Sequence, residues 1–100
     1  MKINEYKNFI LEHKFFEAHE ALEEFWFPRR KQKDDLTLLV KGFINAAVSF
    51  ELYKRGRVEN SAKVWSVYKK FVKLVEKVDN QELRDLQRFI ESFHNKYIEQ

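Results

Sequence analysis

The sequence contains no cysteine, one proline and two glycines in 100 residues. Without cysteine there is no disulfide, no thiolate metal ligand and no cysteine nucleophile. So few turn-forming residues argue against a β-sandwich or barrel, whose strands need a turn about every 8–12 residues. No apolar run approaches the roughly 20 residues of a membrane-spanning helix, and the first residues lack the apolar stretch of a signal peptide. We therefore expect a cytoplasmic protein.

Hydrophobic residues make up 44% of the chain and include ten phenylalanines, which is enough for a folded core. Apolar side chains recur at spacings of three and four residues, which predicts helices. The predicted segments are 4–13, 15–27, 36–53, 59–78 and 79–97, with Pro28 ending the second and Gly56 following the third. Only Lys41 is charged between Leu36 and Phe50, so the third helix is expected to be central. The sequence predicts one all-α domain over residues 1–100, a compact bundle of about five helices.

The second predicted helix places two polar residues among large apolar ones. On a helical wheel with about 100° per residue, Glu23 lies close to His19, within the arc of Phe16 and Trp26. Three other glutamates point away from this arc or lie at its border: Glu17, Glu20 and Glu24. We therefore expect His19 and Glu23 to face the interior together, where a buried carboxylate needs a partner.

Three interpretations of this pair are open. The first is a polar network that fixes the helix register, helped by the seam of Lys41, Asn45 and Ser49 on the third helix. The second is a ligand pocket, and the third is a metal site, because His and Glu four residues apart can share an ion. The candidate site comprises Glu17, His19, Glu20, Glu23, Trp26 and Asn45, and we assign it no metal or cofactor. A second spacing of this kind, Glu91 to His94, lies near the C-terminus, where we expect His94 at the surface.

Charge is unevenly distributed along the chain. Residues 1–28 contain three lysines and six glutamates, whereas residues 29–77 contain thirteen basic and five acidic groups. The basic segment includes a candidate phosphate-binding set: Arg29, Arg30, Lys31, Lys33, Lys54, Arg55 and Arg57. No recognition-helix pattern accompanies it, so nucleic-acid binding is a minor alternative.

The fourth predicted helix has more apolar surface than one contact requires. Trp65 and Val72 lie in one line at its edge, seven residues apart, with Glu76 beside them. Two exposed apolar groups in line suggest a partner surface, and two-fold dimers are the commonest assembly. We predict a symmetric homodimer through this edge; the alternative is that another helix of the same chain covers Trp65.

The segment Phe16-Glu17-Ala18-His19-Glu20-x-x-Glu23-x-x-Trp26 resembles the signature of the small helical proteins called domain of unknown function 309. The stretch 42–48, the pair Arg55-Gly56 and a later alanine, Ala62, are similar to the second half of that family. Two positions differ, because Asn45 replaces a common glutamine and Glu51 replaces a frequent histidine. The resemblance spans about residues 5–78 and implies a compact all-helical fold, with no established activity.

Together these patterns favour a binding or interaction module without its own catalysis. The alternative from a different class is a metal-dependent hydrolase or other small enzyme that uses His19, Glu20 and Glu23. The two differ in whether His19 and Glu23 line an open cavity or a closed core.

Overall fold

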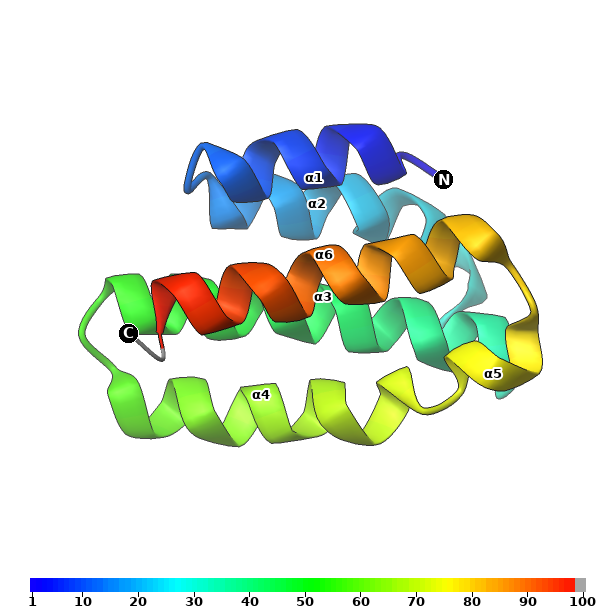
Figure 1. Cartoon of the computed structure of the whole chain (residues 1–100). Coiled ribbons are helices and arrows are strands. Elements are labelled where there is room, and N and C mark those ends of the chain that lie inside the picture. Colours follow the sequence, from blue (N-terminus) through cyan, green and yellow to red (C-terminus); the bar gives the residue numbers. More distant parts are fainter. Residues whose placement is uncertain (99–100) are drawn as a thin grey trace.

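The computed structural model describes residues 1–98, and the regular structure in that range is entirely helical (Figure 1). Five helices there have nine residues or more: α1 (Ile3–Leu11), α2 (Phe15–Trp26), α3 (Asp35–Lys54), α4 (Val58–Val72) and α6 (Gln81–Tyr97). Two short elements join them, the 3-10 turn η1 (Phe27–Arg29) and the single-turn helix α5 (Val75–Val78). The predicted all-α bundle around the third helix is confirmed.

The ends of α3 follow from local sequence. The Asp34 side chain accepts a 2.8 Å hydrogen bond from the backbone N–H of Thr37, which caps the first turn. This hydrogen bond lowers the pKa of the Asp34 carboxyl below its ordinary value. At the other end Gly56 has φ +80°, a conformation that glycine adopts without strain. The N–H groups of Gly56 and Arg57 bond to the carbonyls of Tyr53 and Leu52, as in a Schellman motif.

Two predicted boundaries were wrong. The fourth helix does not continue through residue 78, because the chain turns at Lys73 and Leu74 and restarts as α5, which brings Val75 into the core. The last helix begins at Gln81 rather than at residue 79, because the side chain of Asn80 caps it by accepting a hydrogen bond from the N–H of Leu83 at 3.1 Å. Asp79 instead adopts a left-handed conformation with φ 51° between α5 and α6.

Helix α3 lies behind α6 and between α2 and α4 (Figure 1), and its contacts with those two neighbours are the most extensive in the described fold. Small residues allow the close approach of α4, since a β-carbon on Gly42 would lie 2.9 Å from that of Phe71. Further along the same contact, the Ser61 hydroxyl donates a 2.7 Å hydrogen bond to the carbonyl of Ser49, and both serines are buried. The α3–α4 contact is therefore tight and polar groups within it are paired.

Two buried tyrosines form hydrogen bonds between helices. The Tyr6 hydroxyl on α1 donates a 2.7 Å hydrogen bond to the carbonyl of Phe43, and burial raises the pKa of Tyr6 well above its ordinary value. The Tyr68 hydroxyl on α4 donates to the Glu91 carboxylate on α6 at 3.0 Å. Burial, together with that carboxylate, raises the pKa of Tyr68.

Aromatic side chains fill much of the space beneath α6. The ring centroids of Phe50 and Phe93 lie 5.0 Å apart, and those of Phe50 and Phe15 lie 5.6 Å apart. Contrary to what the short apolar runs indicated, α3 is by length and composition alone long and apolar enough to cross a membrane, but more than half of its apolar window is buried within this fold. The cytoplasmic location stays a prediction.

Candidate functional site

The buried face of α2 is not the face expected from its large side chains. Its buried residues are Phe15, Ala18, Ala21 and Leu22, an arc centred away from His19. Phe16, placed in the predicted interior arc, is 55% exposed, and Phe27 is 53% exposed. The expectation failed because the two alanines, which carry little hydrophobic area, let α1 and α3 approach α2 closely. The inward-facing orientation predicted for His19 and Glu23 was therefore wrong.

His19 and Glu23 nevertheless form a pair at the border of that arc. Their Nε2 and Oε2 atoms are 2.8 Å apart, and the side chains are 22% and 37% exposed. The other glutamates of the predicted site, Glu17 and Glu20, are exposed. The pair is thus reachable from solvent and needs no further partner to satisfy a buried charge.

A groove of about 280 Å³ runs between α2 and α3 beside this pair. Its lining residues come from both helices: Phe15, Phe16, His19, Val48, Glu51, Leu52 and Arg55. The ring of Phe16 lies 5.8 Å from that of His19, at one wall. On the opposite helix Glu51 pairs with Arg55, with Oε2 and Nε 2.7 Å apart. The groove is therefore mainly apolar, with a His–Glu pair at one side and a Glu–Arg pair at the other.

The predicted polar seam on α3 does not join the pair. Ser49 donates its hydroxyl hydrogen bond to the Ala46 carbonyl at 2.7 Å and lies buried toward α4. Lys41 instead places its Nζ atom 4.4 Å from the centre of the Trp26 ring, a cation–π contact that α2 and α3 share. Asn45 is half-buried, and within residues 1–98 no hydrogen bond joins its side chain to Glu23. Neither Trp26 nor Asn45 lines the groove.

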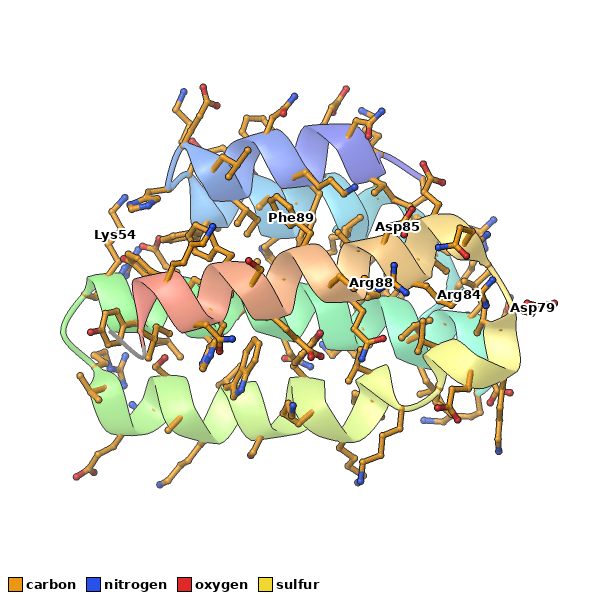
Figure 2. The ribbon with its side chains drawn as sticks, in the orientation of Figure 1. Lys54, Asp79, Arg84, Asp85, Arg88 and Phe89 are labelled. Carbon is orange, nitrogen blue, oxygen red and sulfur yellow. The ribbon has the colours of Figure 1, made fainter. Side chains whose placement is uncertain are left out.

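Most cations of the predicted phosphate-binding set are used within the fold. Arg29 and Arg30 each stack over a neighbouring phenylalanine at 3.9 Å and donate to a backbone carbonyl. Lys54, near the end of α3 (Figure 2), donates to the carbonyl of His13 at 2.9 Å, and Arg55 pairs with Glu51 as described. These side chains cap and connect helices of the bundle.

The expected exposed line of Trp65 and Val72 was also wrong. Val72 is buried, and the half-buried Trp65 ring stacks on the ring of His94 with centroids 3.7 Å apart and planes at 10°. His94 is itself 6% exposed, so its expected surface position was wrong as well. Helix α6 covers this edge of α4, which was the intramolecular alternative. The homodimer stays a prediction, but Trp65 and Val72 do not form the exposed apolar surface from which it was inferred.

Sequence reasoning missed several residues that share a surface in three dimensions. It treated Phe16 as core, although Phe16 lines the groove together with His19 and Glu51. It also missed a cavity between α4, α5 and α6, because Arg84 and Arg88 belong to a segment with net negative charge. Within residues 1–98, no three His, Asp or Glu side chains are arranged so that they could hold a metal ion.

These observations define a small all-helical protein with a His–Glu pair beside a solvent-accessible groove. The model of the family described as "Domain of unknown function (DUF309)" matches residues 3–64, more than half of the chain, so the chain belongs to this family. The matched region contains the whole α2–α3 groove and ends within α4. No curated protein matches the chain, and no solved structure does.

Proposed function

We propose that this protein is a binding module without catalysis of its own, and that its ligand site is the α2–α3 groove. The observation that carries the proposal is the exposed ring of Phe16 beside the half-buried pair of His19 and Glu23. All three residues belong to the signature segment, yet among the positions that the signature specifies only Ala18 is buried in the core. Polar and aromatic groups at an accessible groove are typical of recognition rather than of packing.

The charge around the groove favours a basic partner. On α2, Glu20 is exposed next to His19 and Glu23 is half-buried, whereas the cation of the groove, Arg55, is already paired with Glu51. Glu24 lies on the other side of α2 and pairs with Lys2 at 2.8 Å. A partner segment with apolar side chains for the groove and lysine or arginine beside them would complement both features. The occupant we propose is therefore a basic amphipathic helix of another protein, bound in the helix-in-groove mode.

This proposal can be tested with a synthetic peptide of leucine and lysine, in which leucines recur at helical spacing. We expect amide resonances of residues 15–23 and 48–55 to shift in ¹⁵N-correlated spectra when the peptide is added. The variant Phe16→Ser should weaken binding about tenfold, because it removes the apolar wall that the leucines contact. Phe27→Ser is the matched control, since Phe27 is equally exposed but does not line the groove.

Two outcomes would contradict the proposal. One is equal weakening by Phe16→Ser and Phe27→Ser, which would place binding outside the groove. The other is equal binding of a peptide with glutamate in place of lysine, which would show that the carboxylates beside the groove do not select the partner.

A second candidate, hydrolysis assisted by a metal, has one observation in its favour. The His19–Glu23 contact at 2.8 Å places two ligand atoms together at an open groove. Glu20 is exposed, and within residues 1–98 no hydrogen bond links it to either residue. Calorimetric titration with Zn²⁺ would favour this candidate if one ion bound per chain and His19→Ala abolished the binding.

A further inference from the structure

A second cavity, of about 570 Å³, lies between the end of α4, α5 and the first half of α6. Its volume is in the range of sites that bind small molecules. Its lining residues all fall between Lys69 and Glu91, beyond the part of the chain that the family model matches. The cavity shares no lining residue with the α2–α3 groove, so the two sites can be tested separately.

Four cations from two helices line this cavity. Lys69 and Lys73 lie four residues apart on α4 and its C-cap, and Arg84 and Arg88 lie four residues apart on α6. Four residues of helix advance about 6 Å, so each pair presents two positive groups along one wall. Figure 2 places Arg84 on the part of α6 that is beside α5, and Arg88 further along α6 toward its middle.

The two lysines are available to a ligand. Both are exposed, and neither forms an ion pair or a hydrogen bond through its side chain with another group in residues 1–98. The outward side of α4 carries further lysines, which adds to the positive potential around the opening.

The two arginines have only exposed partners. Arg84 pairs with Asp79 at 3.1 Å, and the Asp79 side chain is 88% exposed. Arg88 lies 3.8 Å from Asp85, with both side chains largely in solvent. Exposed pairs of this kind are weak, so an anion in the cavity can take the place of either carboxylate.

Two carboxylates also line the cavity, against the four cations. Glu91 accepts hydrogen bonds from Tyr68 at 3.0 Å and from Gln87 at 3.2 Å, which holds it at the wall. Glu76 is exposed on α5. The lining residues alone therefore have an excess of two positive charges, because Asp79 and Asp85, the partners of the arginines, do not line the cavity. An anion that displaces these two exposed carboxylates would meet that excess.

The chemistry of the lining points to phosphate groups. Arginine guanidinium groups bind phosphate oxygens in a two-pronged geometry, and lysines add point charges. The floor is formed by the buried Val72 and Val75, and no aromatic ring is among the described lining residues on which a base could stack. We propose that this cavity binds a short polyphosphate chain, either free or carried by a nucleotide, with the two cation pairs on opposite sides of the chain.

Calorimetric titration of the full chain at low salt, with sodium tripolyphosphate as the probe, tests this proposal. We expect one tripolyphosphate per chain, and a loss of affinity of about tenfold or more in the double variant Lys69→Gln/Lys73→Gln. The matched control is Lys63→Gln/Lys70→Gln, which removes the same charge from exposed residues of α4 that do not line the cavity. The affinity of the control variant for tripolyphosphate should fall by less than about threefold, because it lowers only the positive potential around the protein and removes no lining residue. Unchanged thermal unfolding of both variants would exclude a folding defect.

Comparison with ATP identifies the source of the phosphates. Equal affinity for ATP and tripolyphosphate supports recognition of the phosphate groups alone. Tighter binding of ATP, weakened by the same double variant, supports a nucleotide as the ligand. The proposal is overturned if tripolyphosphate does not bind, or if both double variants lose affinity equally. It is also overturned if a single-stranded oligonucleotide binds far more tightly than either probe, which would indicate a nucleic-acid surface instead. None of these outcomes depends on Phe16 or the α2–α3 groove.

Discussion

A β-carbon on Gly42 would lie only 2.9 Å from the β-carbon of Phe71, so α3 and α4 touch where glycine alone fits without a shift. Gly42 begins the stretch that resembles the second half of the family pattern, and the contact gives that glycine a structural role. The stretch also contains Ala46 and Ala47, both fully buried. This part of the family resemblance therefore follows from helix packing.

We expect Gly42→Ala to lower the free energy of unfolding by about 1–3 kcal/mol, since the added methyl group pushes on Phe71. In a helix interior without such a contact, the same change would be stabilising by up to about 1 kcal/mol. Urea denaturation followed by circular dichroism measures the difference. Asn45→Ala, one helical turn away on a half-buried face, is a suitable control for alanine itself. A stabilised Gly42→Ala variant would mean that α4 moves aside at no cost.

Tyr6→Phe removes the hydrogen bond to the Phe43 carbonyl while keeping the ring in the core. The expected loss is about 1 kcal/mol, the usual net value of one such bond. Urea denaturation at neutral pH measures this loss, and an unchanged midpoint would indicate that the Phe43 carbonyl needs no second donor.

The same variant changes the response to alkaline pH. Because burial raises the pKa of Tyr6, the folded protein keeps this proton where the unfolded chain loses it, above about pH 10. The unfolded state then binds fewer protons, so the free energy of unfolding falls as pH rises. Tyr6→Phe should make this fall shallower by up to about 1.4 kcal/mol per pH unit, which unfolding experiments between about pH 9 and about pH 11 would measure. Equal slopes in both proteins would contradict the assignment to Tyr6.

The pair of His19 and Glu23 is partly exposed, so its contribution to stability is small. A double-mutant cycle with His19→Ala and Glu23→Ala should give a coupling energy of about 0.2–1 kcal/mol, the usual range for an exposed pair. The spacing of four residues predicted the contact. The sequence alone suggested that the pair is buried, so that replacing either residue would lower the free energy of unfolding by more. Coupling well above this range would mean that the groove is closed in solution.

Sequence patterns predicted the helices because their signals are local. Asp34 before an apolar stretch and Gly56 after it mark the ends of α3: Asp34 caps the first turn, and Gly56 follows the last turn as predicted. At the end of α1, by contrast, His13 takes the left-handed conformation with φ 58°, a position where glycine would have been the signal. The same pattern of backbone hydrogen bonds ends both helices. Only at the end of α3 does a glycine in the sequence indicate it.

The errors about the site have a different cause. The helical wheel gave weight to Phe16 for its size, whereas the buried face of α2 includes the small residues Ala18 and Ala21. Which face is buried depends on what α1 and α3 present to α2, and the pattern of one helix does not contain that information. The covering of Trp65 by α6 is a contact of the same long-range kind.

That contact leads to a prediction for Trp65→Lys. The ring of Trp65 lies 3.7 Å from that of His94 and 4.5 Å from that of Tyr68, so a charged side chain would lose this packing and be partly desolvated. We expect the free energy of unfolding to fall by about 2–4 kcal/mol. Val67→Lys, on the same helix at a position 37% exposed, should change it by less than about 0.5 kcal/mol. Urea denaturation and light scattering on the same samples separate stability from assembly. A stable, monomeric Trp65→Lys variant of a dimeric wild type would show instead that Trp65 lies at a subunit interface.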